Sequence, residues 1–188
     1  MKEFLLVGII LAVLAASGAI CMTPEQALKT GTLKLYLSDA PIEAENITGV
    51  YITIEEIQYH LNGEWITCKE FVGPRTYNLL ELTGGNFSLL GEFKLPAGNY
   101  TQIRFMLDIP KIGPPPLNPG CYIKFADNST KPLFVPSGGE TGYKGIGQFE
   151  VPVNGTVEVT ADFDIPTAVV AADSFYILKP TIKLIVNH

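Results

Sequence analysis

The segment from Leu95 to Ile109 most constrains how this chain can fold. Pro96 and Gly98 enclose a tight turn. After the turn, apolar residues alternate with more polar ones from Ile103 onward, which is the two-residue period of a strand with one buried face. Tyr100 follows the turn, where its hydroxyl can bond the backbone as in the tyrosine corner of Greek-key sandwiches. The segment therefore predicts a turn that leads into a central strand.

Short alternating runs recur along the chain, and turn residues separate them. In the run from Val50 to Leu61 the alternation slips by one residue at Glu55-Glu56, which predicts a β-bulge. Asn62-Gly63 predicts a two-residue hairpin turn, because both residues accept positive φ angles. No helical pattern of comparable length interrupts these runs. We therefore expect an all-β fold, an antiparallel Greek-key β-sandwich of about eight to ten strands.

Two strand predictions concern the C-terminal part of the chain. Asn154-Gly155 predicts a second hairpin, between residues 148–153 and 156–163. Residues 175–186 predict one terminal strand, part of which Pro180 confines to a sheet edge because proline lacks an amide donor.

The first thirty residues predict export. Residues 1–19 have the order of a secretory signal peptide: Lys2, an apolar stretch, then small residues. The same stretch is long enough to serve as an uncleaved anchor helix. Lipid attachment at Cys21 is a third possibility, although Ile20 before it is larger than usual. We expect residues 20–30 to form a tether and residues 31–188 to form the folded domain. This domain would lie outside the cytoplasm, and it would be associated with the membrane if residues 1–19 are retained or Cys21 is lipidated.

Five N-glycosylation sequons agree with export. Their number exceeds what the composition would give by chance, although Asn, Ser and Thr also gather in turns without any glycan. The acceptor residues are Asn46, Asn86, Asn99, Asn128 and Asn154.

Size and charge exclude some classes of function. The chain has 188 residues and a formal net charge of −6, enough for one domain with a real core. Because clustered Lys and Arg are absent, nucleic acid is not an expected partner. The two histidines, His60 and His188, lack a nucleophile and base partner in the pattern, so we expect no catalytic residues and no enzyme.

The acidic residues offer one candidate metal site. Asp162 and Asp164 share the outward face of a strand end, and with Asp39 or Asp173 they can supply oxygens to Ca²⁺. Against this, no loop has the dense acidic spacing of a calcium site, and Asp at a strand end is ordinary turn chemistry. No other cofactor is expected.

Two cysteines fall on expected strands of an exported domain. A disulfide between Cys68 and Cys121 is the simplest use of them in an oxidising compartment. The alternative is a pair of small buried apolar side chains. Cysteine-bound metal is disfavoured because no C-x-x-C spacing occurs.

Several segments together resemble one family, the domain of unknown function 4382, which occurs on secreted and lipid-anchored proteins of archaea and bacteria. The resemblance spans nearly all of residues 31–186 and implies a prealbumin-like or carboxypeptidase-regulatory-like sandwich with no assigned activity. It rests on residues 31–41, 50–57, 95–104, 136–138, 162–164 and 176–180.

These observations favour a non-catalytic surface or envelope domain that binds protein or glycan, or has a structural role. One alternative is an accessory carbohydrate-binding or enzyme-regulatory module. Exposed aromatic residues in one strip would favour the carbohydrate-binding form. Another alternative is a filament subunit, in which the tether adds a strand to the open edge of a neighbour. The aromatic candidates are Tyr36, Tyr51, Tyr122 and Trp65.

Export has a direct test. An antibody against residues 31–188 should detect the protein at the membrane or outside the cell after fractionation, because residues 1–19 direct it there. A full-length product found only in the cytoplasm would contradict the prediction.

Overall fold

The computed structural model describes residues 29–40, 46–109, 120–134, 141–165, 169–171, 175–179 and 182–187. In this part of the chain the regular elements are strands and one short 3₁₀ helix, η1 (Leu79–Leu82), so the expected all-β class is confirmed. No helix among these residues is long and apolar enough to cross a membrane. The signal or anchor segment 1–19, most of the tether and Cys21 lie outside the described residues.

The strands follow one another with short connections over most of the chain. They are β1 (Thr30–Ser38), β2 (Ile47–Leu61), β3 (Glu64–Thr67), β4 (Arg75–Asn78), β5 (Ser88–Pro96), β6 (Gly98–Leu107), β7 (Tyr122–Phe125), β8 (Thr130–Phe134), β9 (Tyr143–Val151), β10 (Thr156–Asp162), β11 (Val169–Ala171), β12 (Tyr176–Leu178) and β13 (Ile182–Val186).

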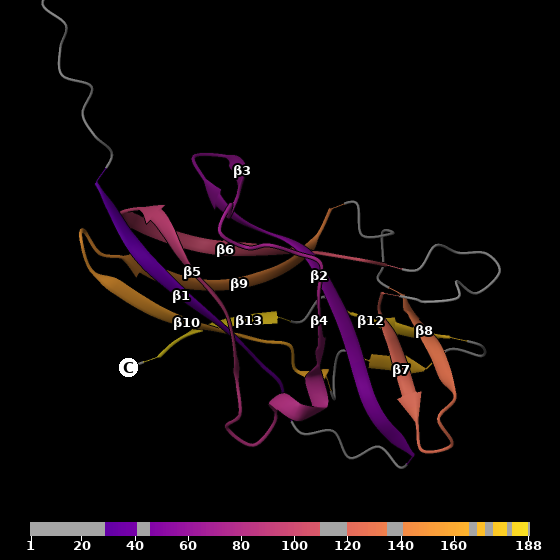
Figure 1. Cartoon of the computed structure of the whole chain (residues 1–188). Coiled ribbons are helices and arrows are strands. Elements are labelled where there is room, and N and C mark those ends of the chain that lie inside the picture. Colours follow the sequence, from indigo (N-terminus) through magenta and orange to yellow (C-terminus); the bar gives the residue numbers. More distant parts are fainter. Residues whose placement is uncertain are drawn as a thin grey trace, which may run out of the picture.

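The long strand β2 joins the two halves of a single 13-stranded sheet. Its first half pairs with β7, and from there the sheet continues through β8 and β12 to β11. Its second half pairs with β6 and continues through β9, β13, β10 and β1 to β5. The other edge of β2 pairs with β4 and β3. In Figure 1, β7, β8 and β12 lie together at one end of the molecule, and β1, β5 and β10 lie at the other.

The sheet is mixed, which corrects the expectation of an antiparallel fold. β1 runs parallel to β10, β12 to β8 and β13 to β9, and the remaining pairs are antiparallel. Side-chain alternation is the same in parallel and antiparallel strands. Strand direction is therefore set by long connections that the local pattern does not encode.

Three local predictions are confirmed. The register of β2 against β6 shifts between Ile54 and Glu56, where the bulge was expected. Asn62 and Gly63 have φ angles of 52° and 87° and connect β2 to β3. The Tyr100 hydroxyl donates a hydrogen bond to the Pro96 carbonyl at 2.7 Å, which completes the tyrosine corner between β5 and β6.

Two predictions about the C-terminal part are wrong. Strands β9 and β10 are not paired, because β13 lies between them, parallel to β9 and antiparallel to β10. Asn154 does sit in a left-handed turn, with φ 54°, but its amide bonds the Thr30 carbonyl at the start of β1. The terminal region forms two strands, β12 and β13, and β13 is interior to the sheet.

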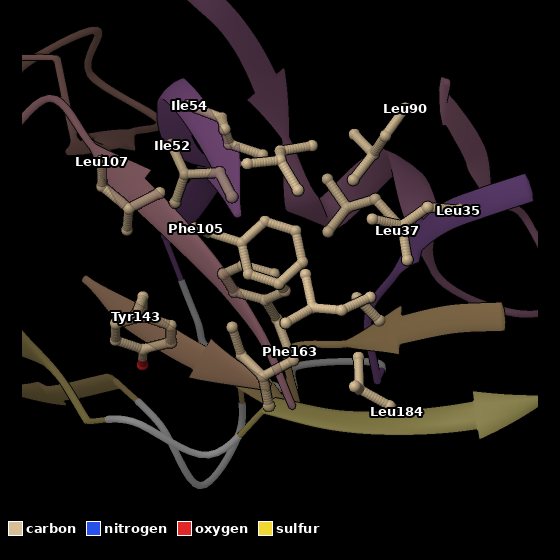
Figure 2. Packing of buried hydrophobic residues seen from close by; sticks show 14 of the residues in the cluster. Leu35, Leu37, Ile52, Ile54, Leu90, Phe105, Leu107, Tyr143, Phe163 and Leu184 are labelled. Carbon is tan, nitrogen blue, oxygen red and sulfur yellow. The ribbon is translucent and has the colours of Figure 1, made fainter. Parts of the chain in front are cut away.

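The inward faces of both halves of the sheet form one hydrophobic core. Phe105 of β6 lies at its centre, between Ile52 and Ile54 of β2 and the ring of Phe163 (Figure 2). The Phe105 and Phe163 rings meet edge to face at 5.8 Å, and Tyr143 stacks on Phe163 at 5.6 Å. Such close packing fixes the position of each strand, because any shift would open a void or force an overlap.

The edge of β5 is covered by one side chain from the β3–β4 connection and one from the first residue of β4. Glu70 Oε1 accepts the Lys94 amide at 3.4 Å, and Arg75 Nη1 donates to the Leu90 carbonyl at 3.4 Å. These bonds occupy backbone groups with which another strand would have to pair. β4 and the connection before it, which lie along one edge of β2, therefore meet the edge of β5 and hinder strand addition there.

Tyr100→Phe tests the importance of the tyrosine corner. The variant leaves the Pro96 carbonyl without its donor and keeps the ring stacked on Phe149, so we expect a loss of about 1–2 kcal/mol in the free energy of unfolding. Denaturant unfolding measures it. The matched control is Tyr51→Phe on the half-buried outward face, which should cost much less. Equal losses in both variants would contradict this role.

Candidate functional site

A surface hollow of about 620 Å³ lies beside the turn between β7 and β8. Its lining combines an aromatic ring, a carboxylate, an ammonium group and neutral hydrogen-bonding groups. The lining residues are Asn46, Phe125, Ala126, Asp127, Ser129 and Lys131.

The β7–β8 turn holds the polar wall of this hollow in place. Asp127 Oδ1 accepts two hydrogen bonds from Ser129, one from its amide at 2.9 Å and one from its hydroxyl at 2.6 Å. Asn128 takes the left-handed conformation, with φ 64°, and its amide bonds the Phe125 carbonyl. The two bonds from Ser129 lower the pKa of Asp127, which keeps this carboxylate charged.

The aromatic part of the hollow is supported from a neighbouring strand. The Phe125 ring lies 5.9 Å from the ring of Tyr176 on β12. Lys131 Nζ lies 5.8 Å from the centroid of each of these rings. The ammonium group thus lies within cation–π distance of two rings, and its residue lines the hollow.

Asn46 is fixed against the same turn. Its carbonyl accepts the Ala126 amide at 2.9 Å, and its φ angle is 73°. Two residues later, the Thr48 hydroxyl donates to the Lys124 carbonyl at 3.3 Å. The start of β2 is thereby attached to β7, and the exposed Asn46 lies on the rim of the hollow.

The hollow has the composition of a site for a small polar ligand with an apolar face. Phe125 offers a ring surface, while Asp127, Ser129 and Lys131 offer charged and neutral hydrogen-bonding groups around it. A sugar has this combination, since its C–H face packs on a ring and its hydroxyls bond the surrounding polar groups.

The structure brings the predicted metal ligands near Asp39, at the point where β1 and β10 end side by side. Both Asp162 and Asp164 act electrostatically on Asp39, and Lys183 Nζ lies 3.7 Å from Asp164 Oδ2. No group of three or more His, Cys, Asp or Glu side chains suited to a metal ion occurs within the described ranges, and Asp173 lies outside them. The calcium site at Asp162 and Asp164 stays a prediction.

Asp39 is a buried carboxyl group with 6% of its surface exposed. Its Oδ1 accepts the Ile165 amide at 2.8 Å, whereas its Oδ2 has no hydrogen-bond partner among the residues that the structure describes. Burial, together with the charges of Asp162 and Asp164, raises the pKa of Asp39 to about 7, although the Ile165 amide acts in the opposite direction. This carboxyl group fastens the chain that leaves β10 to the end of β1.

The predicted disulfide is absent, since Cys68 and Cys121 are both free and buried. The Cys68 amide bonds the Ile57 carbonyl on the edge of β2 that carries β3. Cys121 precedes Tyr122, which pairs with Tyr51 on the opposite edge of β2. Because a strand rises about 3.3 Å per residue, this placement puts the two cysteines well beyond the Cα separation of about 7 Å that a disulfide tolerates.

The four aromatic candidates lie in three separate groups on the sheet. Tyr51 stacks on Tyr122 at 4.6 Å, and Tyr36 meets Phe87 edge to face at 5.2 Å. The third group is Trp65, whose ring is covered by the Arg104 guanidinium at 4.3 Å and approached by His60 at 5.0 Å. They form no common strip, so this expected mark of a carbohydrate-binding face is not present in these residues.

The five sequon asparagines are all solvent-exposed. Asn46, Asn128 and Asn154 occupy left-handed turn positions. Asn86 lies in the connection after η1, and Asn99 lies near the start of β6. Every predicted acceptor is therefore accessible to modification, although this placement is also usual for asparagine in turns.

Sequence reasoning missed the hollow. Its residues come from the start of β2, the end of β7 and the start of β8, and only the pairing of these strands brings them together. A local signal does exist in Asp127-Asn128-Ser129, a turn sequence directly after the aromatic residue Phe125. It predicts a tight turn, but not a ligand.

Comparison with known proteins gives one match. A family model described as "Domain of unknown function (DUF4382)" matches residues 30–180. No curated protein and no solved structure matches the chain.

The raised pKa of Asp39 predicts a pH-dependent stability. Because its pKa in the folded state is about 7, above the ordinary value of 3.8, the folded state binds this proton more tightly than the unfolded state. The stabilisation of the folded state by the protonated Asp39 is complete below about pH 4 and is lost as the pH rises through about 7. Asp39→Asn keeps an acceptor for the Ile165 amide and removes the titration.

Unfolding of the wild-type protein and Asp39→Asn should be compared at pH 4 and pH 8, with a calcium chelator present. From pH 4 to pH 8, the free energy of unfolding of the wild type should fall by about 2–4 kcal/mol relative to that of the variant. A difference between the two proteins that does not change with pH would show that Asp39 is not protonated in the fold.

Proposed function

The chain belongs to the DUF4382 family, and we propose that it is an exported, non-catalytic surface domain that binds a saccharide in the hollow beside the β7–β8 turn. The supporting observation is the combination of the Phe125 ring with charged and neutral hydrogen-bonding groups in one recess. This proposal develops the carbohydrate-binding alternative, and moves the binding position from the outward tyrosines and Trp65 to the hollow.

The chemistry of the hollow supports a neutral or weakly charged saccharide. The ionised Asp127 accepts hydrogen bonds, Lys131 donates them, and their opposite charges leave the hollow with little net charge. Phe125 supplies the apolar surface on which a sugar ring can stack. A strongly anionic ligand would meet the repulsion of Asp127, and an extended apolar ligand would leave the polar groups unpaired.

The state of the cysteines supports the absence of catalysis. Burial raises the pKa of both Cys68 and Cys121 to about 12, so each thiol stays protonated and unreactive at neutral pH. The His60 ring packs beside the Trp65 ring, with the centroids 5.0 Å apart, which gives it a packing role.

Export and the finer fold are part of the same proposal. The exposed sequons support an extracytoplasmic location, reached through a signal peptide or anchor helix over residues 1–19. The contact between Phe105 and Phe163, together with the bonds from Glu70 and Arg75 to β5, supports a prealbumin-like Greek-key sandwich. The filament alternative receives less support, because β13 is interior and the edge of β5 is covered.

A binding titration tests the proposal. Protein produced without glycosylation should bind neutral mono- or oligosaccharides with millimolar affinity, measured by chemical-shift changes at Phe125 and Lys131. Phe125→Leu removes the ring and keeps an apolar side chain, so we expect affinity to fall about tenfold.

The matched control is Phe134→Leu, which removes an aromatic ring from β8 outside the hollow. Its affinity should stay within about twofold of wild type. A protein that binds no saccharide of the panel, or a Phe125→Leu variant that binds as well as wild type, would overturn the proposal.

A further inference from the structure

One acceptor asparagine, Asn46, lines the hollow itself. We infer that the saccharide seated in the hollow is the first part of an N-glycan carried by Asn46, so that this site is filled from within the molecule. The inference rests on the proposed function, because it needs both an exported, glycosylated chain and a hollow that accepts sugar.

The position of Asn46 is fixed relative to the ring that would receive the sugar. The Ala126 amide holds the Asn46 carbonyl, and Ala126 directly follows Phe125 in the chain. The sequon threonine, Thr48, bonds the Lys124 carbonyl on the other side of Phe125. The sequon and the aromatic residue thus belong to one hydrogen-bonded unit, and the exposed Asn46 side chain is accessible for attachment.

Asn46 differs from the other acceptor asparagines because it lines the hollow. Asn128 lies in the turn between two lining residues, Asp127 and Ser129, but is not itself part of the lining. Asn86, Asn99 and Asn154 lie on the η1–β5, β6 and β9–β10 parts of the chain. A glycan on Asn46 starts at the edge of the recess.

Tethering makes a weak sugar site sufficient. A single sugar on an aromatic ring typically binds with a dissociation constant of about 1 mM or weaker, but a short tether gives an effective concentration of about 1–10 mM or more. For a dissociation constant of about 1 mM, the attached sugar therefore occupies the hollow for about half of the time at the lower concentration and about nine-tenths at the upper one. A free saccharide at lower concentration would be displaced.

Occupation of the hollow should stabilise the fold. The sugar would contact residues from the start of β2 and from the β7–β8 hairpin at once, and it exists in this arrangement only when these elements are paired. If the hollow is occupied about ten times as often as it is empty, the melting temperature of a domain of this size should rise by about 3–5 °C.

The experiment compares Asn46→Gln with Asn154→Gln, a matched control that removes an exposed acceptor outside the hollow at another left-handed backbone position. Both variants and the wild type are produced in the organism that encodes the chain and in a host without glycosylation. Mass spectrometry of the peptides measures occupancy, and thermal unfolding measures stability.

Asn46 should be modified in the native host, where Asn46→Gln should lower the melting temperature by about 3–5 °C more than Asn154→Gln does. Without glycosylation the two variants should unfold within about 1 °C of each other, because both replace an exposed asparagine at a left-handed backbone position. On a Phe125→Leu background the effect of Asn46→Gln should shrink, since the ring that receives the sugar is gone.

Free saccharide separates this inference from the proposed function. If unmodified protein binds saccharide and native glycosylated protein does not, while native Asn46→Gln does, the inference is supported. An unmodified Asn46 in the native host would overturn it, as would glycosylated protein that binds free saccharide as well as Asn46→Gln does. Both results leave the proposed function standing, whereas failure of unmodified protein to bind any saccharide contradicts the proposed function itself.

Discussion

The rest of this structure depends on β2 being hydrogen-bonded along both of its edges. Its first half holds β7 and β4, and its second half holds β6 and β3, so one continuous strand joins the two parts of the sheet. The bulge before Glu56 allows this, because one extra residue returns the alternation to the same core after the strand changes partner. Asn46, directly before β2, is thereby placed beside the end of β7, where the hollow lies.

The sequence predicted the features of the fold that depend on neighbouring residues. Alternation identified strands, Asn62-Gly63 identified its hairpin, and the residues around Tyr100 identified the tyrosine corner. The pairing of the strands was harder to predict from neighbouring residues. Asn154-Gly155 has ordinary hairpin chemistry, but a turn fixes only the reversal of the chain, and β13 from far along the sequence takes the place between β9 and β10.

The same limit applies to the candidate site. Asp127 is recognisable as a turn residue, but its use in a hollow depends on Phe125, Lys131 and Asn46 meeting across three elements. The cysteines show the converse. Two strand cysteines in a chain with a signal-peptide pattern suggest a disulfide, but the pairing of β2 places Cys68 and Cys121 apart. The buried state of Asp39 likewise arises from contacts between the ends of β1 and β10, which are distant in sequence.

The central claim of this account is that a sugar attached to Asn46 rests on Phe125. The most direct measurement is the nuclear Overhauser spectrum of the glycosylated protein. We expect contacts between protons of the first sugar and the Phe125 ring, with those sugar signals displaced by the ring current. Sugar signals at the positions of a freely moving glycan, without any contact to Phe125, would contradict it.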